Sequence, residues 1–122
     1  FFNEQAKRYG KQPAPDTNRP QVVSITPAAG ATDVPPGSSE IKVAFDRPMK
    51  DGSWSLVGGG PNFPEITGKP SYDAAGKVWR VAVRLKPNWK YRFWLNSERF
   101  HGFQSREGAV LESVTVSFAT SK

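Results

Sequence analysis

Few side chains in this chain of 122 residues could carry out chemistry of their own. The chain has no cysteine, which excludes disulfides, zinc–thiolate sites and cysteine nucleophiles. His101 is the only histidine, and neither Ser97 nor Ser105 lies in the glycine-flanked turn that exposes a catalytic serine. We therefore expect that the protein is not an enzyme and holds no cofactor.

The acidic residues are scattered along the chain. Asp46 and Asp51 flank one loop, and Asp33 could lie at the same end of the domain. Calcium needs roughly six to eight oxygen ligands, which these residues do not supply at the usual close spacing. A glycosidase pair would need two carboxylates facing each other across a cleft, and the sequence indicates no such pair. We expect no metal site.

Three consecutive glycines, Gly58, Gly59 and Gly60, invite comparison with a phosphate-binding loop. Such a loop requires a helix directly after it and usually a lysine. Pro61 and Pro64 oppose a helix of that kind, so we predict an ordinary loop here.

Aromatic side chains are the strongest candidates for function. Strict alternation places Trp94 on the same outward face as Lys90 and Arg92. Exposed aromatic rings beside arginine and asparagine stack on sugars or fit into the grooves of partner proteins. The predicted ligand or partner surface consists of Arg92, Trp94, Phe100, His101, Phe103 and Phe63. In the alternative, the loop at residues 99–110 folds back and covers Trp94.

Short β-strands must position these residues. Apolar and polar residues alternate between glycine and proline breaks, as half-buried strands require. The strand-like runs are residues 21–26, 40–45, 53–57, a weak run at 69–72, 77–85, 90–96 and 113–120. The sequence therefore predicts an all-β protein with almost no helix beyond residues 1–10.

Alternation also predicts which side chains form the core. The predicted inward set is Val23, Ile25, Ile41, Val43, Phe45, Trp54, Trp79, Val81, Val83, Leu85, Tyr91, Phe93, Leu95, Val114, Val116 and Phe118.

One strand junction carries a more specific pattern. Leu85 lies six residues before Tyr91, which begins a strand. Greek-key sandwiches use such a tyrosine to hydrogen-bond backwards across the corner between two strands. The alternative is an ordinary core tyrosine.

The N-terminal part differs from the rest of the chain. Residues 1–10 could form a helix too short to be stable alone. Residues 12–20 contain three prolines, which favour a semi-rigid spacer. We predict a tail and proline-rich linker at residues 1–20, one domain at residues 21–122, and a larger multidomain parent protein.

The formal net charge of +6 makes the chain basic. Basic proteins attract nucleic acids, anionic lipids or acidic polysaccharides. The lysines and arginines of the predicted domain are dispersed singly, which is unlike a nucleic-acid footprint, so we expect no nucleic-acid partner. No apolar run is long enough to span a membrane, and we expect no membrane insertion.

Several motifs follow one another in a recognisable order. They are Ser24-Ile25-Thr26-Pro27 with Gly30-Ala31-Thr32-Asp33-Val34-Pro35, then Ile41, Val43, Phe45, Asp46, Pro48 and Met49, then Leu85, Pro87 and Tyr91, and last Ser117-Phe118-Ala119-Thr120. In this order they resemble bacterial Ig-like domains of the S-layer-protein type, over about residues 20–120.

The resemblance implies an Ig-like Greek-key β-sandwich of about seven strands, found in large surface or envelope proteins. It implies a spacer or adhesion unit, and the family has no shared catalytic residues to transfer to this chain. The segment at residues 52–70 and the loop at residues 99–110 are longer than a minimal spacer needs, which leaves room for binding.

We therefore expect a non-catalytic module of a bacterial surface or exported multidomain protein, located in the cell envelope or outside the cell. It would act as a spacer or protein-interaction unit, with the neighbouring domains of its parent chain as partners. The alternative is a carbohydrate-binding module that uses the exposed aromatic residues, with a polysaccharide as partner. An accessory domain of a hydrolase is a third possibility.

Overall fold

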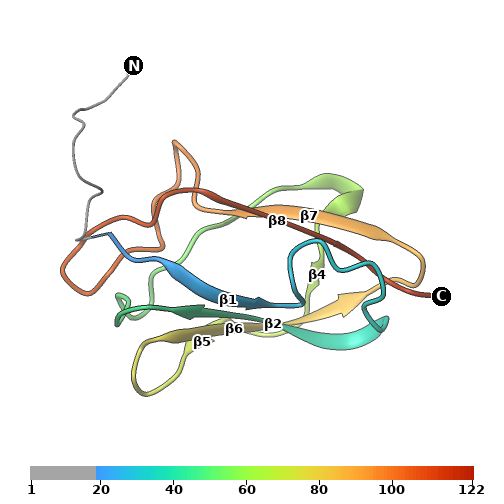
Figure 1. Ribbon diagram of the computed structural model, residues 1–122, viewed down its shortest axis with the longest axis horizontal. Helices are drawn as coiled ribbons and strands as arrows, with labels where there is room; N and C mark the ends of the chain where they lie inside the picture. Colours follow the sequence, from blue (N-terminus) through green and yellow to red (C-terminus); the bar gives the residue numbers. More distant parts are fainter. Residues whose placement is uncertain (1–18) are drawn as a thin grey trace.

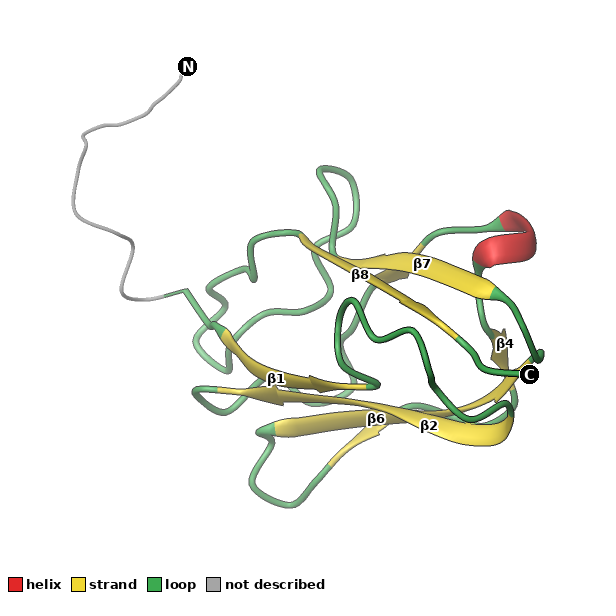
Figure 2. Ribbon diagram, turned by 45° about the vertical axis from the view of Figure 1, so that its right-hand side comes forward, coloured by secondary structure: helices red, strands yellow, loops and turns green. Residues whose placement is uncertain are grey.

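The computed structural model describes residues 19–122, which form two β-sheets packed face to face (Figure 1, Figure 2). The strands are β1 (Val22–Thr26), β2 (Gly37–Phe45), β3 (Leu56–Val57), β4 (Glu65–Ile66), β5 (Ser71–Tyr72), β6 (Val78–Leu85), β7 (Lys90–Leu95) and β8 (Val114–Ala119). One turn of 3-10 helix, η1 (Gly60–Asn62), is the only helix within residues 19–122. The all-β prediction is confirmed, whereas the helix predicted at residues 1–10 and most of the linker lie outside the described residues.

The order of the strands is that of an Ig-like sandwich. One sheet has the order β1-β2-β6-β4, with β5 also paired to β6, and the other has the order β3-β7-β8. If β4 and β5 are taken together as one strand position, this is the ABED and CFG arrangement of a constant-type Ig domain. The predicted Greek-key sandwich is therefore present, with the additional short strand β4 that the sequence pattern did not indicate.

Side chains from both sheets alternate into a single core. On β6 the buried and exposed residues follow each other in strict succession along the strand. The predicted core residues that are buried are Ile41, Val43, Phe45, Trp79, Val81, Val83, Leu85, Tyr91, Phe93, Leu95, Val116 and Phe118. Ile25, Trp54 and Val114 are partly buried and pack against this core.

Val23 does not belong to the core, and the prediction for this residue is wrong. Its side chain is 66% exposed, whereas Val22 and Ile25 pack against the core. The pairing of β1 with β2 shifts register between Val22 and Ser24. A β-bulge at this point inserts one extra residue, and the residues on its two sides therefore no longer follow simple alternation.

The chain crosses from one sheet to the other after β1. It passes through a cis Thr26–Pro27 peptide bond and then runs beside β8. The amide of Gly30 donates to the carbonyl of Ser117 (2.7 Å), and the amide of Ala119 donates to the carbonyl of Ala31 (2.8 Å). Residues 28–34 therefore cover the free edge of β8, which would otherwise expose unpaired backbone groups.

The predicted tyrosine corner joins β6 to β7. The hydroxyl oxygen of Tyr91 accepts a hydrogen bond from the backbone amide of Lys86 (2.7 Å). The hydroxyl of Thr120 donates to the carbonyl of Lys86 (2.6 Å) and accepts from the amide of Trp89 (2.9 Å). Both hydroxyl groups satisfy backbone groups that the turn leaves without a strand partner.

The two ends of the described domain lie far apart. In Figure 1 the start of β1 and the C-terminal Lys122 lie toward opposite ends of the longest axis of the molecule. The chain thus enters the sandwich at one end and leaves it at the other.

Candidate functional site

The outward face of β7 carries a row of three large side chains. They are Lys90, Arg92 and Trp94, and antiparallel pairing sets them opposite Ala119, Ser117 and Thr115 of β8. The residues between them, such as Phe93, point into the core. Because the side chains on β8 are small, the longer side chains of β7 rise above them and form a step on the surface of the sheet.

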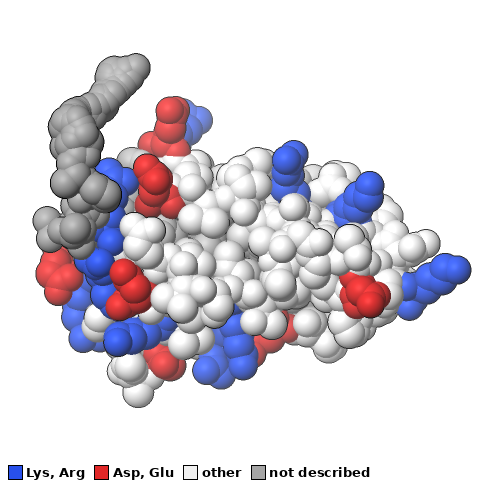
Figure 3. Space-filling model, viewed as in Figure 1, with Lys and Arg blue, Asp and Glu red and all other residues white. Residues whose placement is uncertain are grey.

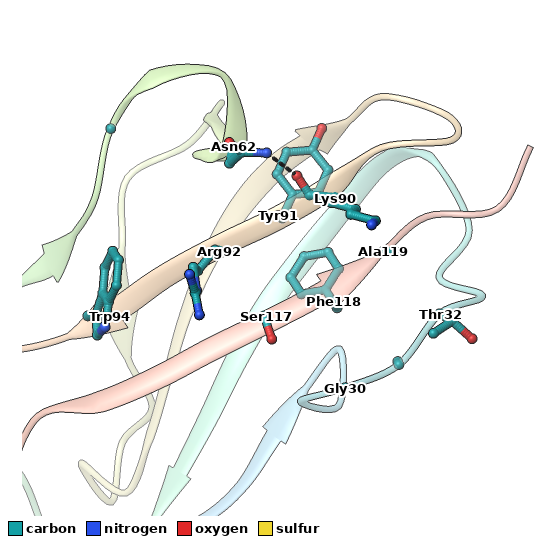
Figure 4. Close-up of a pocket in the computed structure, with 12 residues that line it drawn as sticks. Gly30, Thr32, Asn62, Lys90, Tyr91, Arg92, Trp94, Ser117, Phe118 and Ala119 are labelled. Atoms are coloured by element: carbon teal, nitrogen blue, oxygen red, sulfur yellow. Dashed lines mark hydrogen bonds between the residues drawn. The ribbon is translucent and has the colours of Figure 1, made fainter.

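Beside this step lies a groove, which we call the β7–β8 groove. Its lining residues are Gly30, Ala31, Thr32, Gly59, Asn62, Lys90, Tyr91, Arg92, Trp94, Ser117, Phe118 and Ala119, around a volume of about 560 Å³. Figure 4 shows β8 running between β7 and the loop that carries Gly30 and Thr32, so that β8 provides the floor and the other two segments the walls. Asn62 of η1 fastens the upper rim, since its side-chain amide donates to the carbonyl of Lys90 (2.9 Å).

The charges in the groove are all positive. The lining residues include Lys90 and Arg92 but no aspartate or glutamate. Within residues 19–122 neither of these two cations forms an ion pair with a carboxylate. The guanidinium carbon of Arg92 lies 5.9 Å from the ring centroid of the half-buried Trp94, which is within the range of a cation–π contact.

A second hollow, which we call the edge hollow, opens at the side of the sandwich where β3 faces β4. Its lining residues are Trp54, Ser55, Leu56, Val57, Gly58, Phe63, Ile66, Pro70, Trp79, Val81 and Phe100, around about 540 Å³. Phe100 is 55% exposed and Ile66 is 40% exposed, and both lie on this hollow. The edge hollow is apolar, and Phe63 and Phe100 belong to it rather than to the β7–β8 groove.

Phe103 lies in the core, and its prediction as a surface residue is wrong. Its side chain has no exposed surface and packs edge-on against Trp79, with ring centroids 5.1 Å apart. The ring of Phe45 lies on another side at 5.7 Å. Residues 97–113 therefore close one end of the sandwich, because Phe103 enters the space between the sheets.

Asn96 positions this loop, although it was not among the predicted site residues. The residue is buried, with a positive φ of 63°. Its side-chain nitrogen donates to the carbonyls of Phe103 (2.8 Å) and Leu111 (2.9 Å), and its side-chain oxygen accepts from the amide of Phe103 (2.9 Å). Asparagine tolerates the left-handed conformation better than most residues, which was the one available signal at this strand end.

A close approach at Gly102 holds the loop against the segment before β3. A Cβ atom at this position would collide with the backbone of Trp54. The amide of Gly102 donates to the hydroxyl of Ser55 (2.8 Å), and the hydroxyl of Ser53 donates to the carbonyl of Gly102 (2.6 Å). The neighbouring His101 is exposed.

The structure thus separates the six residues predicted to form one surface. Arg92 and Trp94 share the β7–β8 groove, while Phe63 and Phe100 share the edge hollow. Phe103 is buried, and His101 lies in neither hollow. Lys90 and Asn62 complete the groove but were not among the predicted site residues.

Two acidic residues of the described chain, Asp46 and Asp73, serve local structure. Hydrogen bonds from Arg47, together with one from the amide of Gln21, lower the pKa of Asp46. The backbone amides of Val78 and Lys77 likewise lower the pKa of Asp73. Residues 19–122 contain no group of three or more histidine, cysteine, aspartate or glutamate side chains that could hold a metal ion.

Burial also raises the pKa of one tyrosine. Burial and the nearby carboxylate of Asp51 raise the pKa of Tyr72, whose hydroxyl donates to the carbonyl of Ser53 (2.8 Å). This hydroxyl therefore stays protonated and acts as a structural donor.

The surface charges are mixed in sign. On the face drawn in Figure 3, lysine, arginine, aspartate and glutamate gather mainly toward the end where β1 begins, and the middle is largely uncharged. This face thus lacks the continuous basic patch that is typical of nucleic-acid-binding proteins. In the part of the chain that the structure describes, no helix has the length and apolar character needed to cross a membrane.

Comparisons with known proteins agree with this architecture. Two structures of the surface layer protein SbsC are similar, one described as a crystal structure of the S-layer protein and the other as its domains 1–6. Both match with a TM-score of 0.50, at 17% and 18% sequence identity, over 84% of this chain. This chain spans only 14% of the chain in either structure, so the likeness concerns the fold of one part.

A family model described as "Bacterial Ig-like domain" matches residues 16–120. No match was found among the curated proteins. Since the matched residues include the two sheets, the corner and the groove described above, the chain belongs to the bacterial Ig-like domain family.

Proposed function

We propose that this chain is a non-catalytic module of a bacterial surface or exported multidomain protein, and that it spaces or orients the domains on its two sides. The observation that carries the proposal is the position of the two ends of the domain, which lie toward opposite ends of its longest axis (Figure 1). A module built in this way lengthens a chain of domains, whereas a module with adjacent ends would branch from it.

The internal bonding supports the same role. β2 and β6 pair over eight successive residue positions, from Gly37 opposite Leu85 to Ala44 opposite Val78. Ladders of this length, packed on a core, hold the two ends at a fixed separation because each backbone bond restricts its neighbours. The similarity to parts of a much longer surface layer protein supports a place within a large exported protein.

A replacement experiment in the source bacterium tests the spacer role. The coding sequence for residues 19–122 is exchanged for an unrelated Ig-like sandwich of similar length, and in a second strain it is deleted. We expect the parent protein with the exchanged domain to reach its normal position and amount at the cell surface. The parent protein without the domain should not reach them. If exchange and deletion impair the protein equally, the parent protein requires the specific surface of this domain and not only its length. The spacer role would then be wrong.

A second function, carbohydrate binding, is favoured by one specific observation. The β7–β8 groove combines the half-buried Trp94 with two cations that have no carboxylate partner within residues 19–122. Aromatic rings with polar neighbours are a common way to hold sugars. A screen of the purified domain against immobilised polysaccharides tests this function, and binding to none of them would exclude it.

A further inference from the structure

The shape of the β7–β8 groove matches an extended polymer. Its floor consists of the short side chains of Ser117 and Ala119, and one wall is the row of Lys90, Arg92 and Trp94. The row from Lys90 to Trp94 covers four steps along the strand, which span about 13 Å. The groove therefore has the length for about two or three linked sugar rings.

We infer that the β7–β8 groove binds an anionic polysaccharide, with Lys90 and Arg92 contacting its acidic groups and Trp94 packing against a sugar ring. This inference rests on the carbohydrate-binding function proposed above, and it names the class of ligand. It is independent of the spacer role.

The charge of the groove favours an acidic ligand over a neutral one. Both cations are exposed, and no lining residue is acidic. A carboxylate or sulfate between them would form charge-assisted hydrogen bonds, which are stronger than those of a neutral hydroxyl group. A neutral sugar would leave both cations without a negatively charged partner.

The polar groups of the groove favour a saccharide over a nucleic acid. Ser117 and Thr32 supply hydroxyl groups to the lining, and Asn62 supplies an amide at the rim. Sugars present many hydroxyl groups that such side chains can hydrogen-bond. Single-stranded nucleic acid is held instead by several aromatic platforms along a basic channel. Only one lining side chain, Trp94, offers an aromatic ring on the outward face of β7.

The test uses the full chain, an oligogalacturonate and a neutral oligogalactose of equal length, followed by nuclear magnetic resonance and calorimetry. We expect the acidic oligosaccharide to bind at least about tenfold more tightly than the neutral one, because charge-assisted bonds require the acid groups. The shifted signals should belong to Lys90, Arg92, Ser117 and the indole of Trp94. Affinity should fall as salt is raised, since exposed charges are screened.

Two double variants distinguish the effect of the groove cations from the effect of the overall charge of the domain. Lys90→Gln with Arg92→Gln removes both groove cations, whereas Arg80→Gln with Arg84→Gln removes the same charge from exposed positions on β6, in the other sheet. The groove variant should lose at least about tenfold in affinity, and the β6 variant should stay within about twofold. Equal losses in both variants would overturn the groove assignment. The thermal midpoint of each variant checks that it is folded.

Other outcomes distinguish this inference from the function on which it rests. The two sugars could bind equally, with binding lost in Trp94→Ala but kept in Lys90→Gln with Arg92→Gln. This result would preserve carbohydrate binding and reject an acidic ligand. No binding of either sugar would overturn the acidic ligand, whereas carbohydrate binding itself is decided by the polysaccharide screen described above. Tighter binding of a single-stranded oligodeoxynucleotide at the same signals would assign the groove to nucleic acid instead.

Discussion

At the scale of single residues, the turn between β6 and β7 depends on two hydroxyl groups. Tyr91 accepts from the amide of Lys86, and Thr120 donates to the carbonyl of the same residue. Both side chains are buried, so neither hydrogen bond can be replaced by bulk water without opening the corner.

Tyr91→Phe should therefore lower the free energy of unfolding by about 1–3 kcal/mol, because the amide of Lys86 loses its acceptor at a partly buried position. Denaturant unfolding measures the change. Tyr72→Phe is the matched comparison, since it removes a hydrogen bond from a half-buried side chain, and its loss should be smaller. An unchanged midpoint for Tyr91→Phe would show that the corner does not stabilise the domain.

Asp73 links stability to pH. Its pKa in the folded domain lies below its ordinary value of 3.8, chiefly because the backbone amide of Val78 donates to the carboxylate. A carboxyl group with a lowered folded pKa stabilises the domain above its unfolded pKa, and this contribution is lost as the pH falls through the folded pKa.

Asp73→Asn should accordingly be less stable than the natural chain at pH 7, and the difference should shrink as the pH is lowered toward 3. Thermal midpoints of both proteins across this range provide the measurement. A difference that stays constant with pH would mean that the charge of Asp73 contributes nothing to folding.

At the scale of elements, the length over which apolar and polar residues alternate decided which strands and buried residues could be predicted. β6 alternates over eight residues, and every buried residue on it was predicted. β1 has five residues and contains the bulge that turns Val23 outward, which no feature of its sequence indicated. β4 has two residues, too few for any period, and exists because its backbone pairs with β6.

The loop after β7 illustrates the same limit for the candidate site. Phe100 and Phe103 are chemically identical and lie close together in the sequence, yet one is 55% exposed and the other is fully buried. Hydrogen bonds from Asn96 to Phe103 and from Gly102 to Ser55 decide between them. The contact between Gly102 and Ser55 joins segments far apart in the sequence, so local sequence patterns could not reveal it.

Phe103→Ala should destabilise the domain by about 3–5 kcal/mol, since it leaves a cavity beside Trp79 and Phe45. Phe100→Ala removes the same ring from an exposed position and should change stability by less than about 0.5 kcal/mol. Chemical denaturation of the two variants compares them directly. Similar losses in both would contradict the placement of the loop.

At the scale of the whole molecule, the proposed spacer role and the proposed binding surface use different parts of the two-sheet domain. The ends of the domain lie along its longest axis, while the β7–β8 groove lies on the outward side of the second sheet (Figure 1, Figure 4). Neighbouring domains attached at the two ends would leave this face open. Spacing and ligand binding are therefore compatible in one module.

The most direct test of the central claim, that this domain belongs to a bacterial surface or exported protein, is antibody labelling of intact cells of the source bacterium. An antibody raised against residues 19–122 should label unpermeabilised cells or recover the protein from the culture medium, while an antibody to a cytoplasmic protein labels only lysed cells. Detection of the domain solely after lysis, in the cytoplasmic fraction, would contradict the claim.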